Sequence, residues 1–440
     1  MPLLLRRAMY NLRGGFLVRP LAIALALGCL GALLSSLEES IPHISTWTPT
    51  VLFPSRADPQ VAQIILGAIA ASIMTVVSIV FAILLMTLTL ASMQFSPRII
   101  VSFVKDRATQ WTLGIFLGTF LYCMAALPTA HSRPYPVAPV FTTMGAMLLA
   151  VACVGWLLFF IHHISRAISV NHIVDKIAAE TVAMIDDMMP WPHRPDSPLR
   201  DLPVFPSWET PVESQVSGYI RFIDGRRLVA LAKSYRIKIN VLRRVGHFVP
   251  AGVPLLMVTK GERLSPEGRA DLLAAFDLGP TRTLQQDVEF GVLQIVDIAL
   301  KAISPAVNDP TTAISCVDQL SRIMIRFAAR EIPESVLYDP PGTLRVVIPW
   351  MGFDRLLESA FEQIRLYAKS DVAVSLRLLR ALGDIAASTP DSRYRRLLVE
   401  RGSRIVSGCV EKLAEDEVAA LHVRMGALRA IHEQSTPDPV

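Results

Sequence analysis

The hydrophobic positions of this chain form four long runs near its start and shorter periodic patterns after them. The longest run, from Val61 to Met93, holds 33 residues without one ionisable side chain. A helix needs about 20 apolar residues to cross a bilayer, and at about 1.5 Å per residue this run would reach about 50 Å. We therefore expect a membrane-spanning helix that is longer than the lipid requires.

Three further apolar runs are also long enough to span a membrane. Lys and Arg gather before the first run, between the second and third, and after the fourth, so the positive-inside rule places both termini in the cytoplasm. The sequence predicts a four-helix transmembrane domain over residues 1–165, which contacts the lipid bilayer directly. The predicted spans are about 20–37, 61–93, 111–127 and 137–161.

One side of the longest run carries small or hydroxylated side chains at a spacing of 3.5 residues, and the opposite side is bulky. Such a stripe either packs closely against another helix or lines a wetted path, and both interpretations stay open. In the third span, Gly114 and Gly118 form a pattern that permits close helix packing. The stripe consists of Ala71, Thr75, Ser78, Ala82, Leu85, Thr89 and Ser92.

The pattern changes after the fourth span. An amphipathic connecting helix is expected at 166–189, a proline-rich linker at 190–211, a small β module at 212–262, a helical domain at 263–434 and a short tail at 435–440. Within the helical domain, Thr343–Pro349 reads as a strand, and Phe353–Gln434 reads as about four helices with breaks near Ser370, Thr389–Ser392 and Ala414–Asp416. The fold class is therefore mostly α, with a cytoplasmic α+β region in which a helical bundle follows a β-barrel-like module. The barrel expectation rests on a likeness of Gly218–Asp224 and Gly246–Leu255 to the half-motifs of barrel-sandwich hybrid domains, and an unrelated β-meander is the alternative.

A group of polar residues flanks the apolar helix predicted over Leu284–Ile303. They could converge on a small-molecule ligand, an ion or a neighbouring domain. Helix capping is the competing explanation for part of the group, because Asp309 followed by Pro310 fits a helix start. The group consists of Arg282, Gln286, Asp287, Asp297, Asn308, Asp309 and Thr311.

Composition narrows the classes of function. The chain is 52% hydrophobic and 18% charged, which excludes a wholly soluble protein, and its net charge of +5 fits cytoplasmic flanks beside anionic lipid better than nucleic-acid binding. Cysteines and histidines lack metal-ligand spacing, and no phosphate loop, nucleophile elbow or dinucleotide turn is present, so no metal, cofactor or enzyme activity is expected. Were there a catalytic site, Asp287, Asp297 and Asp309 would be the first carboxylates to test.

Two long motifs resemble the signature of a known family. Gln94–Arg98 reads Q-F-S-P-R and Ser304–Ala313 reads S-P-A-V-N-D-P-T-T-A. The chain is similar here to an uncharacterised family of bacterial predicted membrane proteins that carries a domain of unknown function. This resemblance implies a bacterial inner-membrane protein and supplies no catalytic residue.

Two hypotheses of function follow. In the first, several copies assemble around the long second span as a homo-oligomer with a channel-like role, and the cytoplasmic region forms a vestibule or gate. In the second, the spans anchor a sensor or scaffold whose cytoplasmic module binds a ligand or partner.

Overall fold

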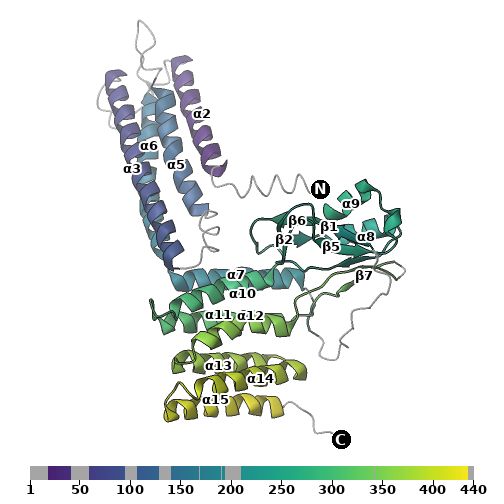
Figure 1. The fold of residues 1–440 in the computed structure, drawn as a ribbon. Coiled ribbons are helices and arrows are strands. Elements are labelled where there is room, and N and C mark those ends of the chain that lie inside the picture. Colours follow the sequence, from purple (N-terminus) through teal and green to yellow (C-terminus); the bar gives the residue numbers. More distant parts are fainter. Residues whose placement is uncertain are drawn as a thin grey trace. The chain divides into compact units, whose positions relative to one another are not determined.

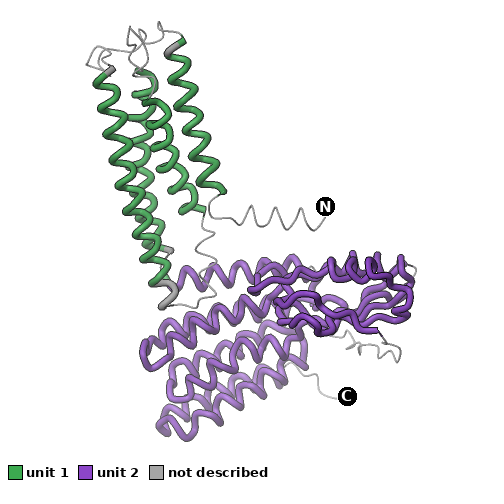
Figure 2. Tube along the Cα trace, turned by 45° about the horizontal axis from the view of Figure 1, so that its top comes forward, with its two compact units in different colours: residues 1–169 green, residues 170–440 purple. Residues whose placement is uncertain are grey.

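The computed structural model describes residues 18–40, 59–94, 107–127, 140–167, 169–189, 191–193, 210–340 and 342–434. The chain divides into two compact units, residues 1–169 and 170–440 (Figure 2), and each is described by itself. The linker predicted at 190–211 lies almost entirely outside the described residues, as does the tail at 435–440.

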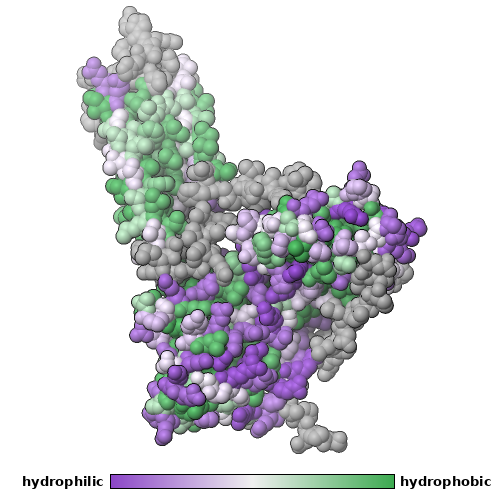
Figure 3. Space-filling view, viewed as in Figure 1, coloured by the Kyte–Doolittle hydropathy of each residue, from purple (hydrophilic) through white to green (hydrophobic). Residues whose placement is uncertain are grey.

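The described residues of unit 1 form four helices (Figure 1), of which α2, α3 and α6 are long and apolar enough to cross a membrane. Figure 3 shows hydrophobic residues over much of the visible face of this unit. The fourth helix, α5, corresponds to the predicted third span but is more polar. Its polar residues include Gln110, Thr112 and Thr119, which are buried. The helices are α2 (Val18–Ser40), α3 (Pro59–Gln94), α5 (Arg107–Ala126) and α6 (Val140–Ala167).

Helix α5 contacts each of the other three helices. It lies closest to α2, because glycines of both helices face the partner: a Cβ on Gly118 would lie 3.1 Å from Cβ of Leu27, and one on Gly31 would lie 2.7 Å from the carbonyl oxygen of Tyr122. Gly114 likewise faces Ile23 and Pro20 of α2. The G-x-x-x-G pattern of α5 is thus used for packing inside one chain.

A buried carboxylate joins α2 to α6. The side chain of Glu38, near the end of α2, is almost fully buried and accepts hydrogen bonds from the backbone of Phe141 and Thr142 at the start of α6. These backbone groups belong to the first turn of a helix, where N–H groups have no partner within the helix. The carboxylate therefore caps α6 from a distant part of the chain.

Unit 2 begins with α7 (Val170–Met188) and contains two open sheets. The larger has the strand order β1-β5-β3-β8-β7 and the smaller the order β4-β2-β6. Within the larger sheet, β3 and β8 are parallel and the other neighbouring strands are antiparallel. The strands are β1 (Thr210–Glu213), β2 (Gly218–Ile223), β3 (Ile239–Val241), β4 (Phe248–Val249), β5 (Pro254–Val258), β6 (Phe276–Gly279), β7 (Val336–Asp339) and β8 (Thr343–Val347).

The remaining helices of unit 2 stack side by side, with α7 against α10 and α11, and α13 between α11 and α15 (Figure 1). Their apolar faces are buried against one another, as the period of the sequence requires. Helix α8 packs against β7 and β8, and α9 contacts α8. The helices are α8 (Gly225–Ser234), α9 (Pro266–Leu273), α10 (Val288–Ala302), α11 (Pro310–Ala328), α12 (Phe353–Tyr367), α13 (Val372–Ser388), α14 (Ser392–Cys409) and α15 (Glu415–Gln434), with a short 3-10 turn at Gly261–Arg263.

Two features of unit 2 differ from the sequence expectations. The β-barrel-like module is not seen, because the described strands form open sheets. In addition, β6, β7 and β8 belong to these sheets although they lie within residues 263–434, where a purely helical domain was predicted apart from a strand-like stretch at Thr343–Pro349. The segment following α11 returns to pair with β3, so the sheets and the helices share one unit.

Candidate functional site

Unit 2 contains a cavity of about 220 Å³ between its sheets and its helices. Its lining includes the last residue of β2, the segment that follows β8, the end of α7 and the start of α10. Most of the wall is apolar, and Met188, Met189 and Met351 supply flexible side chains that adapt to different shapes. The cavity is lined by Met188, Met189, Ile223, Gly225, Arg226, Arg244, Val245, Gln286, Asp287, Val288, Glu289, Phe327, Leu337, Ile348, Pro349, Trp350 and Met351.

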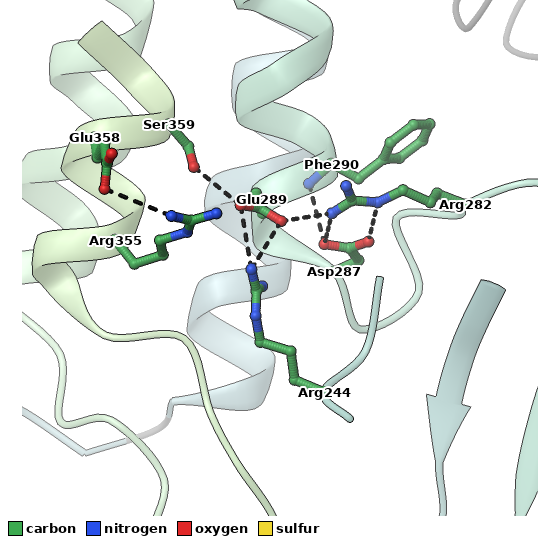
Figure 4. Close-up of polar contacts among 8 residues, drawn as sticks. All are labelled: Arg244, Arg282, Asp287, Glu289, Phe290, Arg355, Glu358 and Ser359. Carbon is green, nitrogen blue, oxygen red and sulfur yellow. Dashed lines mark hydrogen bonds and ion pairs between the residues drawn. The ribbon is translucent and has the colours of Figure 1, made fainter. Parts of the chain in front are cut away.

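A hydrogen-bonded ion network forms the polar part of this wall (Figure 4). Arg282 donates from Nε and Nη2 to the two carboxylate oxygens of Asp287, at 2.7 and 2.8 Å, and from Nη2 to Glu289 at 3.0 Å. On its other side, Glu289 accepts hydrogen bonds from Arg244 at 3.2 and 3.3 Å and from the hydroxyl of Ser359 at 2.9 Å. Charged partners therefore surround both carboxylates.

Local backbone geometry positions the network. Asp287 is the N-cap of α10 and accepts a hydrogen bond from the backbone N–H of Phe290 at 3.1 Å. Gly246 has φ +89°, and a Cβ there would lie 2.5 Å from Oδ2 of Asp287 and 2.6 Å from Nη2 of Arg282. Only glycine combines this backbone conformation with such a close approach, so the turn before β4 can pass directly over the ion pair.

The network also shifts the pKa of Glu289, and burial together with nearby charges shifts that of the neighbouring His247. Burial raises the pKa of Glu289, but Arg244 and the hydrogen bonds from Arg244, Arg282 and Ser359 outweigh it, so the pKa of Glu289 is lowered. Burial lowers the pKa of the neighbouring His247 side chain, and the cationic Arg244 lowers it further. The carboxylate of Glu289 is thus ionised at neutral pH, whereas His247 is uncharged.

This arrangement suits binding better than proton transfer. A general base needs a carboxylate that is free to take a proton, whereas the described oxygens of Asp287 and Glu289 already accept hydrogen bonds from guanidinium groups. Gln286 is also engaged, because its amide oxygen accepts from the backbone N–H of Ile223 at 3.0 Å and its amide nitrogen donates to the Ile223 carbonyl at 3.4 Å. The polar wall is preorganised around an apolar space.

The seven polar residues singled out in the sequence do not form one site. Arg282, Gln286 and Asp287 lie together at the start of α10, and Asp287 and Gln286 line the cavity. Asp309 instead caps α11, where it accepts hydrogen bonds from the backbone and the hydroxyl of Thr312. The 15 residues of α10 separate the two groups by about 22 Å.

The other members of the group stay apart from the cavity as well. Asn308 precedes the cap of α11 with φ +50°, and Thr311 is exposed in the first turn of that helix. Asp297 is half-buried in the middle of α10 and does not line the cavity. Helix capping and turn geometry therefore explain the residues after α10.

Sequence reasoning did not find Arg244, Glu289, Ser359 or Arg226. A signal existed for Glu289, which is an acidic residue in the first turn of an otherwise apolar helix, yet it is buried there. Arg244 and Ser359 come from segments far apart in the chain, and a basic residue in a turn usually points to solvent. Their convergence on Glu289 follows only from the tertiary fold.

The stripe of small residues on α3 faces away from the other helices of unit 1. Ala71, Thr75, Ser78, Ala82 and Thr89 are exposed, whereas Ile73 and Val80 on the opposite side are buried. The hydroxyls of Thr75, Ser78 and Thr89 donate to carbonyl oxygens one turn back in their own helix. The side chain of Ser92 lies outside the described part of α3.

Comparison with known proteins gives one family and several relatives. The family described as predicted membrane protein (DUF2254) matches residues 13–384. An uncharacterized protein of Mycobacterium tuberculosis and one of Mycobacterium bovis are each 31% identical over 433 residues, which covers 97% of this chain and 82% of the relative. No solved structure matches the chain. The resemblance seen in the sequence motifs is confirmed.

Proposed function

The chain belongs to the DUF2254 family of predicted membrane proteins, and from that premise we propose that it is a membrane-anchored sensor whose soluble unit binds a small molecule. In this proposal, α2, α3, α5 and α6 all cross the inner membrane of a bacterium. Both termini, and with them unit 2, lie in the cytoplasm. The distribution of Lys and Arg around the spans supports this orientation.

The cavity in unit 2 carries the proposal. Ligand sites are concave and mostly apolar, with a few fixed polar groups, and this cavity combines an apolar wall with the network of Arg244, Arg282, Asp287 and Glu289. The engaged carboxylates support a binding role without catalysis. The chain is therefore proposed to act by ligand occupancy and not as an enzyme.

The experiment is to fill the cavity and ask whether a co-purifying molecule is lost. Met351→Trp places a larger side chain on the cavity wall, and Met257→Trp is the matched control, because Met257 is half-buried on β5 and does not line the cavity. Native mass spectrometry of the full-length protein should detect a bound small-molecule mass in the wild type and in Met257→Trp, and not in Met351→Trp. If the same bound small molecule were detected on all three proteins, the proposal would be contradicted.

A channel-like homo-oligomer is the second candidate function, and the exposed stripe on α3 supports the assembly of several copies that it requires. Small residues let helix backbones approach closely in a membrane, so a second copy of the chain would pack well here. Because the hydroxyls of Thr75, Ser78 and Thr89 donate within α3, the stripe is better suited to dry packing than to a water-filled path.

Cysteine cross-linking in native membranes tests this second candidate. Ser78→Cys and Ala82→Cys, each combined with Cys29→Ala to remove the exposed native thiol, should form disulfide-linked dimers. Ser72→Cys is the matched control, because Ser72 is also exposed but lies about 120° around the helix from Ser78 and about 80° from Ala82. If the oligomer conducts, Ala82→Leu should abolish current in planar bilayers. Equal cross-linking at all three positions would contradict packing through the stripe.

A further inference from the structure

The charge around the cavity points to the chemical class of its ligand. We infer that the cavity binds a small amphiphilic carboxylate, with its apolar tail in the cavity and its anionic head at Arg226. This inference deepens the proposed sensor function and rests on it.

The balance of charge on the lining favours an anion. Three guanidiniums, those of Arg226, Arg244 and Arg282, face or adjoin the cavity, against the two carboxylates of Asp287 and Glu289. The two carboxylates are satisfied by Arg244 and Arg282, so a cationic ligand would find no carboxylate without an arginine partner on this wall. One positive charge is left over, that of Arg226.

Arg226 is placed to receive the head group. It is exposed in the first turn of α8 and also lines the cavity, so this residue belongs both to the cavity wall and to the solvent-exposed surface. Among the described residues, no hydrogen bond or ion pair engages its side chain. The adjacent Arg227 differs, because its guanidinium contacts Asp271 and the carbonyl of Ala274, both at 3.4 Å, and it does not line the cavity.

The interior is suited to a short hydrocarbon tail. Buried Ile223, Phe327 and Ile348 form the inner wall, and Met188, Met189 and Met351 adapt to the shape of a chain. The volume of 220 Å³ is below the range of about 300 to 1,000 Å³ that is typical of drug-sized ligands. The ligand is accordingly a short chain with one charged end.

The test measures binding of octanoate to the full-length protein in lipid nanodiscs by equilibrium dialysis. Octylamine and 1-octanol have the same tail with a positive or an uncharged head, and they separate charge recognition from partition into lipid. Arg226→Gln removes the head-group contact, and Arg227→Gln is the matched control. Since all three proteins sit in the same lipid, differences among them report the protein site.

We expect Arg226→Gln to weaken octanoate binding about tenfold, because one charge-assisted contact is lost. Arg227→Gln should bind octanoate as the wild type does, and 1-octanol should bind equally to all three proteins. Unchanged octanoate binding in Arg226→Gln, or tighter binding of octylamine than of octanoate, would overturn the inference. So would the absence of saturable octanoate binding.

The failure of this inference is distinguishable from failure of the sensor proposal. If octanoate does not bind but Met351→Trp still removes a co-purifying mass, the cavity binds a ligand of another class and only the carboxylate assignment falls. If neither effect is observed, both fall. Thermal unfolding of Arg226→Gln near the wild-type midpoint would show that lost binding is not lost folding.

Discussion

The carboxylate of Glu38 accepts hydrogen bonds from both the backbone N–H and the hydroxyl of Thr142, at 3.0 and 2.5 Å, although the two residues are 104 positions apart. A charged group is rarely buried without such partners. Here the carboxylate satisfies the free N–H groups of the first turn of α6 and links that helix to the end of α2.

Removing the carboxylate of Glu38 should destabilise unit 1. We expect Glu38→Ala to lower the free energy of unfolding by about 2 to 4 kcal/mol, because several hydrogen bonds to a charged acceptor are lost. Thermal unfolding of the detergent-solubilised protein checks this, with Glu38→Gln expected in between. Ser40→Ala is the control, since Ser40 is exposed and its hydroxyl donates only to the carbonyl of Ser36. Equal midpoints for all variants would refute the capping role.

Two N-cap aspartates should differ in their contribution to stability. Asp287→Ala removes a helix cap and also leaves the half-buried Arg282 with one carboxylate fewer, so we expect a loss of about 3 to 5 kcal/mol. Asp309→Ala removes the cap of α11 and the hydrogen bond from the Thr312 hydroxyl but breaks no ion pair, and it should cost about 1 kcal/mol. Thermal unfolding of the two variants side by side measures the difference, and equal losses would argue against a structural role for the ion pair.

The close approach of α2 and α5 depends on glycine. A Cβ on Gly31 would meet backbone atoms of Tyr122, which cannot rotate away, so Gly31→Ala should destabilise the protein by about 1 to 3 kcal/mol. Gly155→Ala on α6 is the matched control, because a Cβ there meets nothing within 4 Å. Its midpoint should equal or slightly exceed that of the wild type, as alanine favours helix. A loss in Gly155→Ala as large as that in Gly31→Ala would contradict this explanation.

Acid should weaken the contact of Asp391 with His193 and Arg393. Burial raises the pKa of Asp391, but hydrogen bonds from Arg393 and His193 outweigh it and lower the pKa to about 2. A lowered pKa means that the stabilisation is complete above the unfolded value of about 3.9 and disappears as the pH falls through about 2.

The variant Asp391→Asn makes this pH dependence measurable. It should be less stable than the wild type by about 2 kcal/mol at pH 6, and the difference should shrink below about pH 4 and be lost as the pH falls through about 2. Unfolding followed at several pH values checks the trend. Asp384→Asn serves as control, since Asp384 is exposed and lies 3.9 Å from Arg380. A difference between Asp391→Asn and wild type that stays constant with pH would show that the carboxylate is not held ionised.

Most of the helices could be predicted from the periodic spacing of apolar residues. The uninterrupted apolar run gave α3 nearly end to end, and Asp309 with Pro310 gave the start of α11. The breaks expected near Ser370, Thr389–Ser392 and Ala414–Asp416 separate the last four helices as observed. These features are local, since caps, prolines and a period of 3.6 residues act within a few turns.

The sheets and the candidate site were harder to predict from the sequence. Strands β6 and β7 have four residues each, too few to show an alternating pattern, and the pairing of β3 with β8 joins segments about a hundred residues apart. Of the residues singled out in the sequence, Arg282 and Asp287 belong to the ion network beside the cavity. Its remaining members meet only because α10, α12 and the turn before β4 come together in the folded unit.

The parallel pairing of β3 with β8 also bears on how the protein is made. Asn240 of β3 pairs with Val347 of β8. The ribosome must therefore synthesise more than a hundred further residues after β3 before β3, the middle strand of the larger sheet, can pair with β8. Until then, the nascent polypeptide presents a bare strand edge, the kind of surface that invites wrong pairing with other chains. Biogenesis of this protein therefore includes an interval of vulnerability to aggregation that ends when residues 343–347 emerge.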